Sequence, residues 1–553
     1  MTKRMVNMIK VNIINHTSFA VKKETTLLEI AKKLEIKPYA AKVNKRLKEL
    51  NSRLLTDAEI EFLYLDNSDA VRIYEAGLRF VIAKAIKNLY PDSHVSFNYN
   101  VSRSVLAIVK NIENGLNEEH VANIKAEVDR IVKADMPITR KLVNLEEASI
   151  NYHEQGSHDK VSLLQFREEE YVNLYHCGNY INYMYSHMVP STGYLTQYNI
   201  FPYGAGFIIQ YPRAEAGGKI PDFHQAPTFA NALRDAARWG KKTKGTTISN
   251  MNEYALSRSD LIDFVNMCEI KHTNEMHELA QEITSRRKKI RLITIAGPSS
   301  SGKTTFSMRL RITLMSLGLK PVMISIDDYY LPRSSAPIDE YGKPDLEHIE
   351  SLDIERFNND ISALINGEEV TLPRYDFSRS LITEGKTIRV EDDTPIIIEG
   401  IHALNDRLTS KVARDQKFKI YIAPQTQLHI DDHNPISITD LRLLRRLVRD
   451  SKYRNSPATD TMAMWPSVRR GEFRWIYPYQ EGADFVFNTE LSYEFGVLKK
   501  HAIPQLQAIP RNSEYFITAN RLVKFLKYFV DIPDNLVPCN SLLREFIGGS
   551  CFE

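Results

Sequence analysis

Residues 297–305 read Gly-Pro-Ser-Ser-Ser-Gly-Lys-Thr-Thr, and this short segment limits the possible folds more than any other part of the chain. An apolar run at residues 291–296 precedes it, and a helical pattern follows at residues 306–317, closed by Gly318. Glycines let successive amides turn toward an anion at the start of a helix, so GxxxxGK[ST] between a strand and a helix predicts a phosphate-binding loop. We therefore expect an α/β domain built on a parallel sheet.

Each residue type in this loop has a role in binding a nucleotide. The Lys303 ammonium can reach the β- and γ-phosphates, and the Thr304 hydroxyl can ligate Mg²⁺. We predict ATP as the phosphoryl donor and Mg²⁺ as its partner ion. The predicted nucleotide-binding residues are Gly297, Pro298, Ser299, Ser300, Ser301, Gly302, Lys303, Thr304 and Thr305.

Carboxylates follow two further apolar runs. The run at residues 321–326 ends in Asp327 and Asp328, and the run at residues 394–398 ends in Glu399. At the carboxyl ends of parallel strands, such side chains point into the ligand crevice. One aspartate could accept the proton of an attacking hydroxyl while another holds water around Mg²⁺. Glu399 has the position expected for a magnesium or water ligand.

Residues 440–450 predict an amphipathic helix with four arginines on one face, at spacings i, i+3, i+4 and i+7: Arg442, Arg445, Arg446 and Arg449. They could form a solvated face paired with neighbouring carboxylates. They could instead place cations over the transferred phosphoryl group, and we favour this second interpretation beside a phosphate-binding loop. Arg446 and Arg449 are therefore predicted catalytic residues, together with Lys303.

Several motifs in residues 290–490 occur in the same order as in the uridine kinase and phosphoribulokinase group of P-loop kinases, which the chain resembles. They are Ile326-Asp327-Asp328-Tyr329-Tyr330, residues 346–353, Pro373-Arg374-Tyr375-Asp376-Phe377, Ile398-Glu399-Gly400 and Arg445-Arg446-Leu447-Val448-Arg449-Asp450. The resemblance implies that Asp327 is the catalytic base for a ribose 5′-hydroxyl. It also implies substrate contacts by Glu347, His348, Tyr375 and Arg445.

The chain departs from uridine kinases at two places. Ser378-Arg379-Ser380 stands where those enzymes have a histidine after Tyr-Asp-Phe, and residues 451–459 replace their Arg-Gly-Arg lid. We expect phosphorylation of a nucleoside, with uridine first and cytidine or another nucleoside next. One alternative is a kinase for another hydroxylated metabolite, such as a sugar phosphate, bound by the cations Arg333, Arg374 and Arg379. A second is an RNA-associated regulator in which ATP is a signal.

The first 90 residues predict two further units. Residues 7–66 predict short strands and one helix capped by Thr26, a pattern that resembles the TGS domain of threonyl-tRNA synthetases. A long helix at 68–90 ends in Ala-Ile-x-x-Leu-Tyr-Pro, which resembles the editing domain of those enzymes. Its HxxxH positions here hold Ala76 and Phe80, and its Cys-x-x-x-His positions hold Met184 and Met188. None of these binds a metal or moves a proton, so we expect this α+β unit to be inactive.

Residues 171–212 contain nine tyrosines and no Asp, Glu, Lys or Arg. They could stack on nucleobases, although such surfaces normally include cations for the phosphates. They could also be closely packed strands whose hydroxyls pair internally or at a domain interface, and we favour this second interpretation.

The length of 553 residues and these motifs together predict three domains and a connector. The boundaries are 1–67 (TGS-like), 68–226 (editing-like), 227–288 (helical connector) and 289–553 (P-loop kinase). The net charge is +3, but residues 1–67 hold 13 basic and 8 acidic side chains, so RNA binding is plausible there. With no apolar span, no signal peptide and no CxxC pair, we expect a cytoplasmic protein without membrane contact. We also expect a homo-oligomer.

Overall fold

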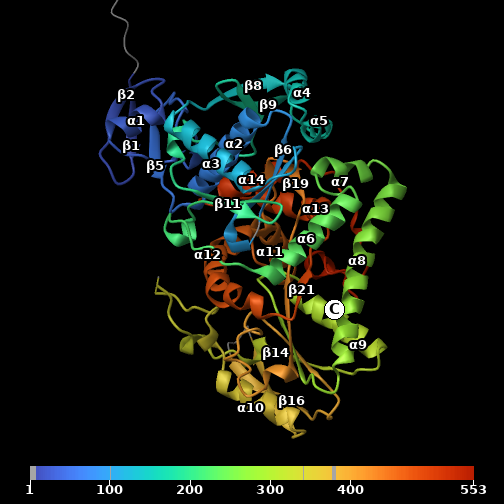
Figure 1. The fold of residues 1–553 in the computed structure, drawn as a ribbon. Coiled ribbons are helices and arrows are strands. Elements are labelled where there is room, and N and C mark those ends of the chain that lie inside the picture. Colours follow the sequence, from blue (N-terminus) through green and yellow to red (C-terminus); the bar gives the residue numbers. More distant parts are fainter. Residues whose placement is uncertain (1–7, 100, 341, 377–380, 553) are drawn as a thin grey trace, which may run out of the picture.

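The computed structural model describes residues 8–99, 101–340, 342–376 and 381–552 (Figure 1). Residues 377–380, which include Arg379 and the position of the missing histidine, lie outside the described residues. Figure 1 shows the N-terminal half, in blue and cyan, beside a C-terminal half in yellow to red. Among the described residues, no helix combines the length and apolarity that crossing a membrane requires.

The small N-terminal sheet has the strand order β2-β1-β5-β3-β4. Thr26 caps helix α1 (Leu27–Lys33) as predicted, because its side chain accepts from the Glu29 amide while Glu29 accepts from the Thr26 amide. The strands are β1 (Met8–Ile13), β2 (Phe19–Lys22), β3 (Ala40–Val43), β4 (Arg46–Lys48) and β5 (Ala58–Leu63).

Helix α2 (Ser68–Leu89) forms the centre of the next unit, as its apolar pattern predicts. Ala76 and Phe80 are fully buried in its hydrophobic core. A four-stranded sheet of order β11-β12-β7-β6 and a three-stranded sheet of order β10-β9-β8 complete the unit. Its other elements are β6 (His94–Tyr99), β7 (Val105–Lys110), α3 (Glu118–Lys133), β8 (Thr139–Asn144), α4 (Leu145–Glu154) and α5 (His158–Leu164).

The tyrosine-rich segment folds into β9 (Tyr171–Cys177), β10 (Tyr180–Tyr183), β11 (Asn199–Tyr203) and β12 (Gly206–Gln210). Several of its hydroxyls pair across the boundary with the C-terminal half. The Tyr183 hydroxyl lies 2.6 Å from that of Tyr528, and the Tyr185 hydroxyl donates to the Arg521 carbonyl over 2.9 Å. These contacts agree with the interpretation of packed strands with interface hydroxyls.

Three helices then lead to the C-terminal sheet: α6 (Pro227–Lys242), α7 (Ile248–Tyr254) and α8 (Arg258–Ser285). This sheet is entirely parallel and has the order β14-β17-β13-β18-β21. Its strands are β13 (Leu292–Ala296), β14 (Val322–Ser325), β17 (Ile396–Glu399), β18 (Lys417–Ala423) and β21 (Phe485–Asn488).

Both faces of the parallel sheet are buried, which explains why its strands read as continuous apolar runs. Ile293 and Ile295 of β13 pack with Phe306 on one face, together with α8 and α9 (Lys303–Ser316). Leu292 and Ala296 pack on the other face, against α6 and α10 (Ile354–Ile365). The hairpin β15 (Val370–Asp376) and β16 (Leu381–Ile388) lies beside α10, at the end farthest from the N-terminal half (Figure 1).

The C-terminal helices close the site and join the two halves. They are α11 (Ile438–Tyr453), α12 (Ala458–Trp475), α13 (Glu494–Gln507), α14 (Phe516–Leu526) and α15 (Arg544–Ile547). Asp440 at the start of α11 pairs with Arg72 of α2 and with Arg521 of α14. A short hairpin, β19 (His429–Asp431) and β20 (Asn434–Pro435), also reaches the N-terminal half, where the Phe97 amide donates to the Asp432 carbonyl over 2.9 Å.

Candidate active site

The phosphate-binding loop lies between β13 and α9, where the sequence predicts it. Gly297 has no room for a side chain, because an added Cβ would lie 2.1 Å from the Ile422 carbonyl oxygen. Gly302 stands at the start of α9 with φ +89°, a conformation that favours glycine. These two glycines allow the loop to approach β18 closely and to turn its amides toward the start of α9.

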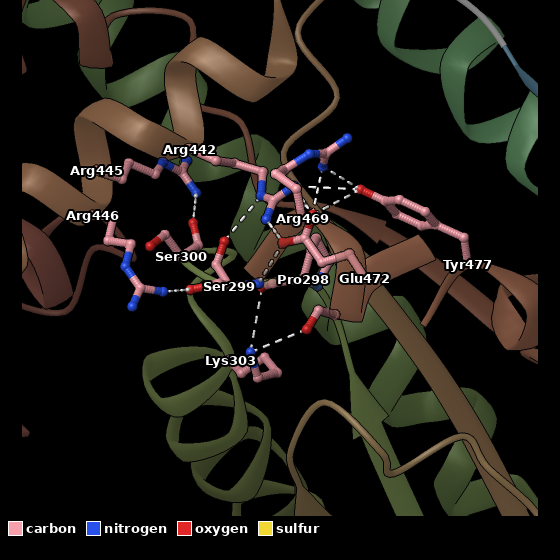
Figure 2. A network of polar contacts seen from close by, with 11 residues as sticks. Pro298, Ser299, Ser300, Lys303, Arg442, Arg445, Arg446, Arg469, Glu472 and Tyr477 are labelled. Atoms are coloured by element: carbon pink, nitrogen blue, oxygen red, sulfur yellow. Dashed lines mark hydrogen bonds and ion pairs between the residues drawn. The ribbon is translucent and has the colours of Figure 1, made fainter. Parts of the chain in front are cut away.

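Lys303 crosses this loop. Its Nζ donates to the carbonyl oxygens of Gly297 (3.1 Å) and Pro298 (3.3 Å), contacts that Figure 2 shows. Burial lowers the pKa of Lys303, while the charges of Glu399, Glu545 and Asp327 oppose that fall. The ammonium is therefore fixed by the loop itself, with one donor left to face an anion between these carboxylates.

Three arginines of α11 hold the outer side of the loop (Figure 2). The Arg442 Nε donates to the Ser299 carbonyl over 2.9 Å, and an Arg446 nitrogen donates to the Ser299 hydroxyl over 2.7 Å. An Arg445 nitrogen lies 3.4 Å from the Ser300 carbonyl. The cations thus bind carbonyl and hydroxyl oxygens of the loop.

Two of these arginines are fully committed to carboxylates, which corrects part of the sequence interpretation. The Arg445 Nε donates to Glu494 over 2.6 Å, with both side chains 0% exposed. Arg442 forms a bidentate pair with Glu472, also buried. A buried guanidinium paired in this way cannot reach a substrate, so the structure does not support the substrate contact predicted for Arg445.

Arg446 and Arg449 stand nearer to the predicted reaction centre. Both pair with Asp450, at 3.2 Å and 2.7 Å respectively. Arg446 is one of the charges that act on Glu347, whose carboxylate lies on the acceptor side. These positions are compatible with the predicted role of both arginines, which remains a proposal.

The Thr304 hydroxyl and the carboxylates of Asp327 and Glu399 meet beyond the carboxyl ends of β14 and β17. The Thr304 hydroxyl donates to Glu399 over 3.4 Å. Burial raises the pKa of Glu399 to about 7, and the negative charge of Asp327 adds to the rise. Burial also raises the pKa of Asp327, which Lys303 opposes. A hydroxyl and two carboxylates are hard oxygen donors, so this set fits Mg²⁺, which usually takes one or two carboxylates plus substrate phosphates.

The predicted acceptor residues line the next part of the site. Burial raises the pKa of Glu347 to about 7, against the lowering effects of Arg446 and Lys303. Gly471 of α12 packs directly on this side chain, since an added Cβ would lie 2.5 Å from the Glu347 Cβ. The Tyr375 amide donates to Asp328 over 3.3 Å, which joins the β15 segment to the end of β14.

Sequence reasoning missed two aromatic side chains beside Glu347. The His348 ring lies 4.5 Å from the Trp475 ring, and the His402 ring lies 5.9 Å from it. Burial lowers the pKa of His402 to about 3, so this ring is neutral. The place of His402 three residues after Glu399 could have predicted that it lies near the site. No neighbouring residue in the sequence indicates the same for Trp475.

The C-terminal segment also reaches the loop, which no motif predicts. Glu545 of α15 accepts from the Thr305 amide over 2.9 Å, at the N-terminus of α9. Its neighbours Leu542, Leu543 and Phe546 are fully buried, and Figure 1 places the C-terminus beside α9. Glu472 occupies a second loop amide, that of Ser299, at 3.3 Å. Two carboxylates therefore bind amides of the phosphate-binding loop.

A phosphate-binding loop after the central strand of a parallel sheet, with carboxylates following two neighbouring strands, is the arrangement of a P-loop kinase. Residues 292–492 match the model of the Phosphoribulokinase / Uridine kinase family, and the chain belongs to this family. It is an ATP-dependent kinase.

Individual relatives match different parts of the chain. A uridine kinase of Macrococcus caseolyticus is 31% identical over 199 residues, which cover 36% of this chain and 87% of the relative. A threonine–tRNA ligase of Symbiobacterium thermophilum is 30% identical over 166 residues of the N-terminal part, which cover 30% of this chain and 25% of the ligase. The chain thus spans about a quarter of that ligase, and the comparison confirms the fusion that the sequence predicts.

One solved structure gives a weaker match. A possible uridine kinase from Bacillus stearothermophilus aligns at 19% identity and a TM-score of 0.25, covering 39% of this chain and 98% of that one. A score this low supports no conclusion about the arrangement of the present chain.

The buried pair of Arg445 and Glu494 gives a test of stability. Replacing Arg445 alone by methionine leaves the Glu494 charge uncompensated, so we expect the free energy of unfolding to fall by about 3–5 kcal/mol. The double variant R445M/E494L removes both charges and should regain most of this loss. Chemical denaturation of the three proteins measures the effect, and equal stability of R445M and wild type would contradict the assigned pair.

The Glu545 contact gives a test of nucleotide binding. A phosphate group at the Thr305 amide must displace the Glu545 carboxylate, so E545Q should lower the Kd for ATP by about tenfold, the equivalent of one charge-assisted hydrogen bond. E278Q removes the same charge from an exposed position of α8 and should leave the Kd unchanged. Titration calorimetry with Mg-ATP measures both variants. An unchanged Kd in E545Q would show that the contact does not oppose the nucleotide.

Proposed function

We propose that the kinase transfers the γ-phosphoryl group of ATP to the 5′-hydroxyl of a nucleoside, with uridine or cytidine as the preferred acceptor. The main support is the convergence of Asp327, Glu347 and Lys303 within one buried site, where Lys303 and Asp327 each alter the pKa of the other and both alter the pKa of Glu347. The uridine kinase relatives support the same acceptor class. Homo-oligomerisation of the chain remains a prediction.

The proposed mechanism assigns the proton and the charge to separate groups. Asp327 accepts the proton of the acceptor hydroxyl, and its raised pKa makes it a better base than an exposed aspartate. The freed oxygen bonds to the γ-phosphorus while the bond from that phosphorus to the β,γ-bridging oxygen breaks. Lys303 and Arg446 lie where they can stabilise the negative charge on the transferring group and on the departing diphosphate.

The residues proposed to contact the acceptor orient the nucleoside for the reaction. In the proposal, the Glu347 carboxylate accepts hydrogen bonds from two ribose hydroxyls, while His348 and Tyr375 contact the nucleoside. Trp475 and the neutral ring of His402 extend this wall beyond Glu347. When bound beside Thr304 and Glu399, Mg²⁺ supplies charge neutralisation for the phosphates of ATP.

Neighbouring aspartates test the identity of the base. We expect D327N to lower kcat for the best nucleoside by about 10²–10⁴-fold, because the proton loses its acceptor. D328N is the matched control, since Asp328 accepts a backbone amide of Tyr375, and it should lose less than about tenfold. An ADP-release assay over a panel of nucleosides and sugar phosphates gives both the acceptor and kcat. A D327N enzyme of normal activity would contradict the assigned base, and a response to sugar phosphates alone would contradict the assigned acceptor.

The raised pKa of Glu347 predicts a pH effect on acceptor binding. With a pKa of about 7, the carboxylate is mostly ionised at pH 8 and mostly protonated at pH 6. Only the ionised form accepts two hydroxyl hydrogens, so the KM for the acceptor should rise by about tenfold from pH 8 to pH 6. In E347Q the KM should be high and independent of pH over this range. A pH-independent KM in the wild type would contradict this role for Glu347.

A further inference from the structure

A large cavity separates the N-terminal half from the kinase domain. Its volume is about 1960 Å³, whereas small-molecule sites usually measure about 300–1,000 Å³. Elements from both halves line it, including α2, β9, α12 and α14. Of the predicted nucleotide-binding residues 297–305, this lining includes Pro298 alone, and the volume exceeds the needs of one nucleotide or one metabolite.

The lining of this cavity is strongly basic. It includes 15 Lys and Arg residues against 8 Asp and Glu residues, an excess of seven charges. The whole chain carries only +3, so the remainder of the molecule is slightly acidic. A positive wall of this kind attracts a polyanion and raises its local concentration.

Many of the cations deeper in the cavity already have carboxylate partners, such as Arg72 and Arg521 with Asp440. Four other lining cations have no carboxylate partner among the described residues. They are Arg46 and Lys48 of β4, Arg511 before α14, and Lys524 of α14. All four are exposed, and no ion pair joins any of them to an acidic side chain in the described parts of the chain.

These four cations lie at a single junction. Strand β4 contacts α14, and the Lys45 ammonium donates to the Asn512 carbonyl over 3.0 Å, next to Arg46 and Arg511 in the sequence. The small N-terminal sheet is thus fixed against the C-terminal helices, and two of its cations, Arg46 and Lys48, line the cavity.

Aromatic side chains accompany the cations. Tyr171 is 53% exposed, and Trp465, Phe473 and Phe516 are partly exposed on the cavity wall. Aromatic faces bind unpaired bases by stacking, and cations bind the phosphates that link those bases. Most other tyrosines of residues 171–212 cannot take part in this way, since hydroxyls such as those of Tyr183 and Tyr185 are already paired.

We propose that this cavity binds a single-stranded nucleic acid segment several nucleotides long, with the phosphates on Arg46, Lys48, Arg511 and Lys524 and the bases against the rings of Tyr171 and Phe516, because arginines already cover Trp465 and Phe473. Pro298 of the nucleotide-binding loop is also among the lining residues, but none of the four proposed phosphate contacts belongs to that loop. A duplex would hide the base faces that the aromatic rings need, and a single nucleotide would fill only part of the volume.

Binding of a fluorescein-labelled RNA octanucleotide to the full-length protein, measured by anisotropy at physiological salt, tests this proposal. The double variant R511E/K524E should weaken binding by at least about tenfold, because it replaces two phosphate contacts with repulsion. K288E/K289E changes the net charge equally at exposed positions outside the cavity and should change the affinity by less than about twofold. Both variants should retain the kinase activity and thermal stability of the wild type.

Any one of five outcomes would overturn the proposal. The first is no binding of the octanucleotide at physiological salt, and the second is an equal loss of affinity in the two charge-reversal variants. The third is equal or tighter binding of a duplex of the same length. The fourth is displacement of the RNA by UMP at concentrations close to the Kd of the RNA. Complete displacement by Mg-ATP would also overturn it, because the RNA would then occupy the nucleotide-binding loop.

Discussion

The contact between the α11 arginines and the phosphate-binding loop determines the arrangement of the rest of the kinase domain. The Ser299 and Ser300 carbonyls and the Ser299 hydroxyl accept hydrogen bonds from Arg442, Arg445 and Arg446. Buried guanidinium groups in turn need carboxylates. Glu494 fixes α13 against α11 in this way, and Glu472 fixes α12.

The position of α12 then shapes the acceptor pocket. Gly471 stands next to Glu472, and its lack of a side chain lets Glu347 pack against the helix backbone. Trp475, one turn further along, lies beside His348 and His402. An arginine contact on the phosphate-binding loop therefore positions the residues proposed to bind the acceptor, which would link the two proposed substrate sites.

Local sequence patterns were sufficient to predict those features that depend on residues close together in the chain. The loop, the strands that end in Asp327 and Glu399, the Thr26 cap and the long helix α2 all follow from spacing within a few residues. The structure does not support a phosphate-facing Arg445, because periodicity gives the relative directions of four side chains but not their partners. Those partners, Glu472 and Glu494, lie 30 and 49 residues further along the chain. Glu545 was missed for the same reason, since it approaches the loop from a distant segment.

The C-terminal segment links nucleotide binding to folding of the tail. Leu542, Leu543 and Phe546 are buried, so apolar contacts rather than Glu545 alone hold α15 on α11 and the loop. Where the Glu545 carboxylate and a phosphate compete for the Thr305 amide, binding of one weakens binding of the other by the same factor. If a phosphate takes the Thr305 amide, a contact that holds Glu545 on this amide would raise the ATP concentration that the kinase requires, and saturating ATP would weaken the Glu545 contact to the same extent.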